Sequence, residues 1–353
     1  MHPVLLAALI SAGGPSSDVW VEREAVLMGT RLMVRIEAPS EAAAGSIIDR
    51  VFARVAELES RWTTGTSGSE LFALREAEPG SAVPLSDDTY ELLATAWSWA
   101  DRTDGAFEPT VGPLVDVWGA GDDGRVPDDV VVDRALASVG RRCFDLSPSS
   151  RAISRHCPDA WIDGGGLGKG AALGAIATVL EDAGVARARV DFGGQVLILG
   201  RGDDASMVDI ADPRDRERPA FRWPDVAGSI ATSAQDERTF AIDGDAYGRV
   251  IDPRSGAPVE PWGSVTVRSD DPVEADALAT ALLVMGPEDG IRWMAARPEV
   301  EAVLLVVSGG TIVACGRESL VRALAPMHAG ATRSDRPLIS PDLRACPGSS
   351  RSE

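Results

Sequence analysis

The order of extended and helical segments is the feature of this sequence that most restricts its fold. Thr30–Glu37 alternates apolar and polar residues, as a half-buried strand does, and Ser40–Ser60 follows with apolar residues at helical spacing. Further helices are predicted over Asp87–Asp104 and Ala171–Ala183, whereas the second half of the chain is mostly short extended segments between turn residues. Blocks of this kind, without steady strand–helix alternation, predict an α+β fold with antiparallel sheets and packed helices.

Three segments of the second half carry more detailed predictions. Ala188–Leu199 is predicted to be one strand with a bulge at its paired glycines, Gly193 and Gly194. Residues 303–315 place a Ser-Gly-Gly turn between two apolar runs and therefore predict a hairpin. Pro272 is expected to open a helix that continues to about Met285, because proline is favoured at the first helical position.

The charge balance excludes several classes of partner. The chain has 34 Lys and Arg against 54 Asp and Glu, a formal net charge of −20. Binding to a nucleic-acid backbone or to an anionic membrane surface requires a positive face, so neither is expected. No apolar run reaches the roughly 18 residues of a transmembrane span.

The two ends of the chain differ from its middle. Residues 1–20 are expected to be a signal peptide or a disordered N-terminus: Val4–Ala12 is an apolar run of signal-peptide length, but no Lys or Arg precedes it and no lipid-attachment Cys follows. Residues 329–353 are rich in Ser, Arg, Pro and Gly and are expected to be a disordered tail. The folded domain is therefore predicted to span residues 21–328.

The cysteines argue against a zinc site. No C-x-x-C pair occurs and the chain has only three histidines. A disulfide between Cys143 and Cys157 is compatible with the sequence, but the spacing of the two residues does not establish it.

The glycine-rich run Ile162–Gly170 contains the only lysine of the chain, Lys169, just before a predicted helix. Glycines allow close approach of a phosphate, and a helix N-terminus favours anions. The run is not a Walker A loop, because Asp163 stands where the first Gly is required and no Ser or Thr follows Lys169. It does not match the dinucleotide pattern begun at Gly164 either. A phosphate-binding loop of another kind and a plain tight turn both remain open.

A second stretch places an acid inside an apolar helix. Asp276 and Thr280 are four residues apart and therefore share one helix face. Burying the acid would be unfavourable without a partner, and one carboxylate with one hydroxyl suits Mg²⁺ that also binds water and substrate phosphate. The alternative is a solvated helix face.

Two further stretches are less specific. Residues 105–114, with Trp118, form a segment bounded by Gly and Pro that can wall a ring-binding cleft or simply pack on the core. Residues 247–256 read as a strand that runs into an Asp-Pro-Arg-Ser-Gly turn.

Taken together and in order, these stretches resemble the FAD:protein FMN transferase (ApbE) family over about Leu27–Met285. The resemblance rests on Met28-Gly29-Thr30, Ser69-Glu70-Leu71, GAFEPTVGPLVDVWG, IDGGGLGKG, DFGGQ, IATS, RVIDPRSG and EADALATALLVMG. It implies an ApbE-like, T-fold-related arrangement of antiparallel sheets and helices around an FAD cleft. It also implies transfer of the FMN half of FAD to a Thr or Ser hydroxyl of another protein, with release of AMP in the presence of Mg²⁺ (Mn²⁺ as an alternative).

The resemblance also assigns residues, partners and a compartment. Metal binding is expected at Asp276, Thr280 and the Gly166 carbonyl, and catalytic roles at Arg249, Asp252 and Asp276. The acceptor is expected to be a flavin-carrying redox protein or a membrane electron-transport subunit, and the family implies the periplasm or cell envelope. The FAD contacts are expected at Met28, Trp62, Ala106, Phe107, Glu108, Asp163, Lys169 and Ile251.

One departure from the family pattern bears on catalysis. Arg249 stands where the family usually has a His that can deprotonate the acceptor hydroxyl. Arginine stays protonated, so it is no general base, although it can stabilise phosphate charge. Two alternatives therefore accompany the transferase: an Mg²⁺-dependent FAD pyrophosphatase that yields FMN and AMP, and a non-catalytic FAD-binding protein.

Overall fold

The computed structural model describes residues 18–120, 124–202, 204–235, 240–242, 245–335, 338–340 and 343–344. Residues 1–17, which include the apolar run read as a signal peptide, lie outside this description. Strand β1 (Val19–Leu27) begins inside the segment that was assigned to the N-terminus, residues 1–20. None of the described helices combines the length and apolarity that crossing a bilayer requires.

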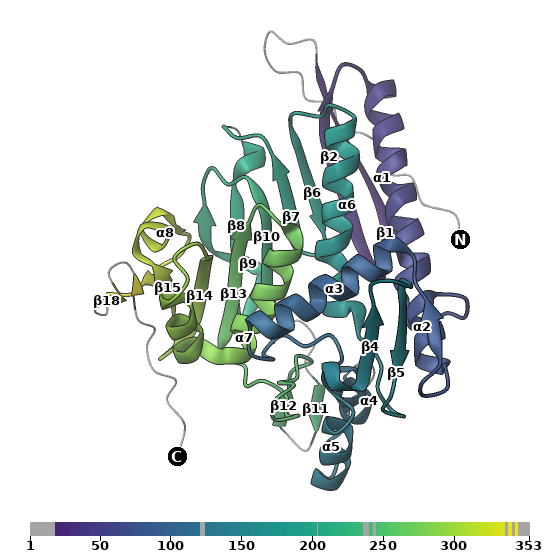
Figure 1. The fold of residues 1–353 in the computed structure, drawn as a ribbon. Helices are drawn as coiled ribbons and strands as arrows, with labels where there is room; N and C mark the ends of the chain where they lie inside the picture. Colours follow the sequence, from purple (N-terminus) through teal and green to yellow (C-terminus); the bar gives the residue numbers. More distant parts are fainter. Residues whose placement is uncertain are drawn as a thin grey trace.

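One large sheet organises the molecule (Figure 1). Its strand order is β1-β2-β6-β7-β10-β13-β14-β15-β19-β18, and β17 pairs with β15 off this path. Neighbouring strands are antiparallel except for β15 and β17, which agrees with the predicted α+β class. After β1, the strands are β2 (Thr30–Ala38), β6 (Ala188–Phe192), β7 (Gln195–Leu199), β10 (Gly228–Ala234), β13 (Gly263–Ser269), β14 (Glu301–Ser308), β15 (Thr311–Arg317), β17 (Ala331–Arg333), β18 (Leu338–Ser340) and β19 (Leu343–Arg344).

Helices cover one face of this sheet. In Figure 1, α1 (Glu41–Trp62), α6 (Gly168–Asp182) and α7 (Pro272–Ala295) lie in front of its strands, and α3 (Asp87–Arg102) crosses below α6. Alternation along β2 buries Leu32, Val34 and Ile36 in the core on this side. The predicted caps hold: the hydroxyls of Ser40 and Ser86 accept hydrogen bonds from the N–H groups of Ala43 and Thr89.

A smaller sheet, β16-β9-β8, lies over part of the opposite face. Apolar side chains from β7, β10 and β14 meet those of β9 in a second core that includes Val196, Ile230, Leu305 and Phe221. The strands are β8 (Val208–Asp212), β9 (Asp215–Trp223) and β16 (Ala325–Pro326). The large sheet is therefore sandwiched between helices on one side and strands on the other.

The other elements form small groups around this sandwich. The sheet β3-β5-β4 is closed by a Cys143–Cys157 disulfide, the pairing that the sequence left open. Its strands are β3 (Ala82–Pro84), β4 (Phe144–Ser147) and β5 (Ala152–Arg155), and β11 (Phe240–Ile242) pairs with β12 (Asp245–Tyr247). The remaining helices are α2 (Glu70–Glu76), α4 (Gly112–Trp118), α5 (Asp129–Leu136) and α8 (Glu318–Ala323), with short 3-10 turns η1 (Arg141–Cys143), η2 (Gly164–Gly166) and η3 (Asp204–Ser206).

Two predictions about glycines are corrected. Gly193 and Gly194 do not bulge a single strand; they are the turn that joins β6 and β7, and both have positive φ (58° and 89°). A two-residue hairpin turn with positive φ at both positions matches the twist of the flanking strands. Helix α6 begins at Gly168 rather than at Ala171, so Lys169 lies in its first turn.

One predicted end is confirmed and another is corrected. The first stretch of α7 ends at Met285 as predicted: the helical path breaks at Gly286 (φ 79°) and resumes as a second stretch from Pro287. Within the predicted tail, residues 329–353, strand β17 pairs with β15 from Ile312 to Ala314, so this part is ordered. Main-chain pairing with the edge of strand β15 accounts for this order, although the composition of the tail is polar. The tail beyond Arg344 lies outside the described residues.

Candidate active site

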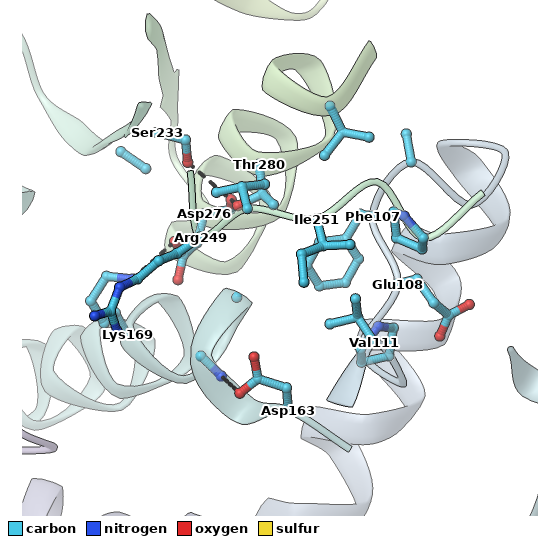
Figure 2. A pocket seen from close by; sticks show the side chains of 18 of the residues that line it. Phe107, Glu108, Val111, Asp163, Lys169, Ser233, Arg249, Ile251, Asp276 and Thr280 are labelled. Carbon is cyan, nitrogen blue, oxygen red and sulfur yellow. Dashed lines mark hydrogen bonds and ion pairs between the residues drawn. The ribbon is translucent and has the colours of Figure 1, made fainter. Parts of the chain in front are cut away.

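A cavity opens where α6, α7, β10 and the segments 106–111 and 249–253 meet. Figure 2 shows two ends: Phe107, Val111 and Ile251 lie at one, and Lys169, Arg249 and Asp276 lie at the other. The cavity therefore combines an apolar wall with a charged end. Of the residues assigned from the sequence, those that line it are Ala106, Phe107, Glu108, Asp163, Gly166, Lys169, Arg249, Ile251, Asp276 and Thr280.

Close contact between α6 and α7 builds the charged end. A Cβ on Gly170 would lie 2.6 Å from the Pro272 carbonyl oxygen, so only glycine permits this approach. It lets the Gly170 N–H donate to Asp276 Oδ2 at 2.9 Å, while Lys169 Nζ lies 3.5 Å from Asp276 Oδ1. Gly170, directly after Lys169, therefore serves the packing of the two helices.

Asp276 is an acid held inside the apolar α7. Its side chain is buried among Ala and Leu residues, and this burial raises the pKa of the carboxyl above its usual range. The positive charge of Lys169 and the Gly170 N–H act in the opposite direction. One turn later, the Thr280 hydroxyl lies 3.4 Å from Ser233 Oγ on β10. The predicted pairing of Asp276 with Thr280 on one helix face is confirmed.

The donor set limits which metal can bind. Among the described residues, no three His, Cys, Asp or Glu side chains gather as a metal-binding group. Asp276, Thr280 and the Gly166 backbone line one cavity and offer oxygen ligands only. A single buried carboxylate with oxygen neighbours fits Mg²⁺, which keeps water and takes substrate phosphates as ligands. It does not fit Zn²⁺, which prefers several N or S ligands.

The apolar end is tied to the glycine-rich run by main-chain contacts. The Asp163 N–H donates to the Pro109 carbonyl at 2.8 Å, and Asp163 Oδ1 accepts from the Gly165 N–H at 3.0 Å. Burial raises the pKa of both Asp163 and Glu108, the latter against hydrogen bonds that the N–H and hydroxyl of Thr110 donate to it. Together with Asp276, three carboxyl groups with a raised pKa therefore border the cavity.

Gln235 positions the segment that carries Arg249. Its side-chain amide donates to the carbonyls of Val250 and Val259 and accepts from the Val250 N–H, at 2.8, 2.6 and 2.9 Å. A Cβ on Gly248 would lie 2.2 Å from this amide, so glycine is required there. Figure 2 shows Arg249 reaching into the cavity that holds Lys169 and Asp276.

Three residues assigned from the sequence do not line this cavity. Met28 occupies the β1–β2 turn with φ 49° and packs against the helical core. Trp62 is buried and donates to Thr89 Oγ1 at 3.2 Å. Asp252 accepts hydrogen bonds from the main-chain and side-chain N–H groups of Arg254 and borders another cavity, and its expected catalytic role stays a prediction.

Other lining residues were not assigned from the sequence. Gln195 donates to the Pro272 carbonyl at 2.8 Å, and its buried Oε1 has no hydrogen-bond partner among the described residues. Ser233 reaches Thr280, as described above. Both belong to stretches that carried the family resemblance, DFGGQ and IATS, but periodicity alone gives them no functional signal.

A known protein family matches the part of the chain that contains these residues. The family model described as "ApbE family" matches residues 28–304. The chain belongs to the ApbE family. The matched range contains every residue of the cavity named above, so the charged and apolar ends both lie within the ApbE region.

Curated relatives agree with this membership. The chain is 29% identical to a Klebsiella pneumoniae protein named FAD:protein FMN transferase, over 87% of this chain and 90% of that protein. A Rhodobacter capsulatus protein of the same name is 32% identical over 88% of this chain and 60% of that protein.

Solved ApbE structures share the fold. A Thermotoga maritima ApbE protein superposes with a TM-score of 0.74 at 26% identity, over 83% of this chain and 96% of that one. The apo form of a Pseudomonas stutzeri flavinyl transferase ApbE gives a TM-score of 0.73 at 27% identity, over 83% of this chain and 92% of that one. The predicted ApbE-like α+β fold is therefore confirmed.

Proposed function

We propose that this protein transfers FMN from FAD to a Thr or Ser hydroxyl of an acceptor protein and releases AMP. The hydroxyl oxygen forms a P–O bond to the FMN phosphorus, the P–O bond to AMP breaks, and the hydroxyl proton is lost to solvent or to the departing phosphate. The observation that carries the proposal is the cavity itself, which pairs an apolar wall with Lys169, Arg249 and a buried Asp276. The relatives' shared name, FAD:protein FMN transferase, supports the same reaction.

The two ends of the cavity suit the two parts of the substrate. Phe107, Val111 and Ile251 offer an apolar surface to an aromatic ring system. Lys169 and Arg249 are cations that can bind the diphosphate, which allows a chain of net charge −20 to hold an anionic ligand. Local cations, rather than overall charge, would therefore provide the attraction.

Asp276, Thr280 and the Gly166 carbonyl would hold Mg²⁺, or Mn²⁺, as their oxygen donors fit. The ion would neutralise phosphate charge and so make AMP a better leaving group. Lys169 has a separate role: it lies 3.5 Å from Asp276 and favours the ionised carboxylate despite burial.

Arg249 would bind phosphate charge rather than remove the proton. A guanidinium stays protonated at any relevant pH, and it can stabilise charge that develops on the phosphoryl oxygens. Positioned general bases contribute roughly 10²–10⁴-fold, so an enzyme without a side-chain base is slower but remains measurable.

The reaction is tested by incubating the protein with FAD, Mg²⁺ and a candidate acceptor protein. In-gel flavin fluorescence on the acceptor, with one AMP per flavin transferred, is the expected result. Free FMN with AMP and no labelled acceptor would instead identify an FAD pyrophosphatase. Tight FAD binding without either product would identify a non-catalytic flavin-binding protein.

We also propose that the protein works in the periplasm or cell envelope, on a redox protein or a membrane electron-transport subunit. The Cys143–Cys157 disulfide supports this compartment, because disulfides persist mainly in oxidising environments. The test is thiol labelling of the protein in intact cells, followed by mass spectrometry. Cys143 and Cys157 are expected to be joined in a disulfide and therefore to remain unlabelled. Labelling of both thiols, with the protein found in the cytoplasmic fraction, would contradict the proposal.

A further inference from the structure

Strand β10 has an edge that the large sheet leaves open. On one side, β10 pairs with β13 from Ser229 to Ala234. On the other side, it pairs with β7 only from Gly228 to Ile230, because the chain turns at Gly193–Gly194 to enter β7. Within the described part of the chain, no main-chain partner pairs with residues 231–234 on this side. An unpaired edge of this kind is a template for an added strand.

The open edge lies between two cavities. Side chains alternate along β10, so Ser233 points towards α7 and the Thr280 hydroxyl, at 3.4 Å. Thr232 points to the opposite face, where its hydroxyl lies 2.9 Å from that of Thr266. Thr232 and Ala234 border both the active-site cavity and a second cavity beneath β8 and β9. A strand added here would therefore present its side chains alternately to each.

The second cavity is polar and carries both signs of charge. Arg189 donates to the carbonyls of Ala205 and Met207, both at 2.9 Å, and burial lowers the pKa of its guanidinium. Asp209 and Arg222 pair at 2.7 Å on the cavity wall, which the exposed Arg216 also borders.

One buried hydroxyl in this cavity points to a ligand. Ser264, directly opposite Ala234 on β13, is 2% exposed, and its Oγ has no hydrogen-bond partner among the described residues. Leaving a buried hydroxyl without a partner is unfavourable. A polar side chain that enters the cavity from the open edge would supply the missing hydrogen bond.

We propose that the acceptor protein docks as an extended segment that adds a strand to residues 231–234 of β10. This inference rests on the proposed function and names how that site takes its protein substrate. The reacting Thr or Ser points into the active-site cavity beside Ser233 and Thr280. Its neighbours in sequence point into the second cavity, whose lining of arginines, aspartates and Ser264 favours polar side chains.

The geometry also explains how a macromolecule reaches a cavity between helices and a sheet. The broad surface of a folded domain cannot enter a cavity that lies between the helices and the sheet. A single strand can, because its main chain hydrogen-bonds to the edge while alternate side chains pass to either face. Residues 231–234 line the active-site cavity, so the edge delivers the hydroxyl to the end that holds Asp276 and Thr280.

The first test uses a library of nine-residue peptides with a central Thr and varied flanks, assayed with FAD and Mg²⁺ by flavin fluorescence. The best substrate is then N-methylated at one amide at a time. Strand addition predicts a period of two: methylation of alternate amides raises KM at least tenfold, and methylation of the intervening amides changes it less than twofold. A scan without this period overturns the proposal.

The second test changes the protein. Arg216→Glu is expected to raise KM for the peptide at least fivefold while FAD affinity stays within twofold. Arg218→Glu is the matched control, because Arg218 is exposed on the same strand and borders neither cavity. Equal effects of the two variants would overturn the proposal.

The two tests separate this inference from the function on which it rests. Flavin transfer to a folded redox protein, with no peptide of the library labelled, overturns strand addition and leaves the transferase intact. Absence of FAD binding and of AMP release overturns the proposed function itself. Peptide labelling with the alternating N-methyl pattern supports both.

Discussion

The two cavities on either side of β10 are built from different kinds of residue. The cavity on the helical side uses short stretches that stand out in the sequence, with Lys169 and Asp276 held together by the contact of α6 with α7. The cavity on the other side uses arginines and acids from β6, β8 and β9, such as Arg189 and Asp209, which look like ordinary strand-surface residues in the sequence. Motifs in the sequence are therefore enough to locate the side proposed to bind the nucleotide, whereas the side proposed to bind the acceptor is located only from the sheet topology.

Loss of Asp276 should produce the largest effect and should be confined to the helical side. Asp276→Ala removes the only carboxylate of the proposed metal site, and we expect at least a 10²-fold loss of FMN transfer with a folded protein. Initial rates at saturating Mg²⁺ and circular dichroism measure the two quantities. Asp289→Ala is the control, since this acid is exposed in the part of α7 that follows the break at Gly286. Wild-type turnover in Asp276→Ala would contradict the assigned site.

Lys169→Ala should weaken FAD binding about tenfold, because it removes a cation from the charged end of the cavity. The Lys169 side chain is about one-third exposed, so the melting temperature should change little. Isothermal titration with FAD and a thermal melt check the two effects.

The same variant has a consequence for pH dependence. The positive charge of Lys169 lowers the pKa of Asp276 against the effect of burial. Its removal raises that pKa further, so the acidic limb of the pH–rate profile should move to higher pH. A large drop in melting temperature with unchanged FAD affinity would instead identify a structural lysine.

Arg249→His is expected to preserve or raise FMN transfer, a smaller effect of at most a few-fold. The imidazole can accept a proton near neutral pH, which the guanidinium cannot. Wild-type activity should rise with pH as the acceptor hydroxyl becomes easier to deprotonate. The flavinylation rate against pH for both proteins is the measurement. A tenfold or greater loss in the variant would show that the contact of Arg249 with the phosphate contributes more to the rate than an added base can replace.

Two carboxylates, one at each cavity, should respond to pH with opposite sign. Burial raises the pKa of Glu108, so its ionisation destabilises the fold as pH rises above about 4. The hydrogen bond from Arg222 contributes to lowering the pKa of Asp209, so that carboxylate stabilises the fold above about pH 4 and loses this effect as pH falls. Glu108→Gln should therefore raise the melting temperature at pH 7, and Asp209→Asn should lower it.

Both differences should be roughly 1–3 °C at neutral pH and should diminish as the pH falls below about 4. Scanning calorimetry of the two variants and the wild-type protein at several pH values checks the signs. Changes in melting temperature of the same sign in both variants would contradict the expected difference between the two cavities.

Much of the helical side could be predicted because its signals are local. The spacing of Asp276 and Thr280 on one helix follows from the 3.6-residue period, and the structure brings both to the cavity. Ser40 and Ser86 cap their helices as expected, because a cap depends on neighbours within three residues. The charged and apolar stretches around Lys169 and Phe107 likewise meet in one cavity.

The residues that were assigned to the site but do not line the cavity share one feature. Met28, Trp62 and Asp252 lie in stretches that resemble the family, but their side chains are held by contacts with Thr89, Arg254 and the helical core. Gln195 was overlooked because its role depends on the carbonyl of Pro272, 77 residues away in sequence. A motif places a residue near a site, and it does not decide which way the side chain points.

The α+β class, the helix that carries Asp276 and the glycine-rich run with the only lysine could be predicted from the sequence, because they depend on periodicity, capping and residue type, which act over a few positions. The ApbE likeness followed from the resemblance of several motifs to that family. The three-dimensional fold was needed to show that Gly193–Gly194 is a turn, that the edge of β10 stays open, and that Ser264 faces a polar cavity. Strand order and register arise from contacts between residues far apart in the chain, and no local pattern encodes them.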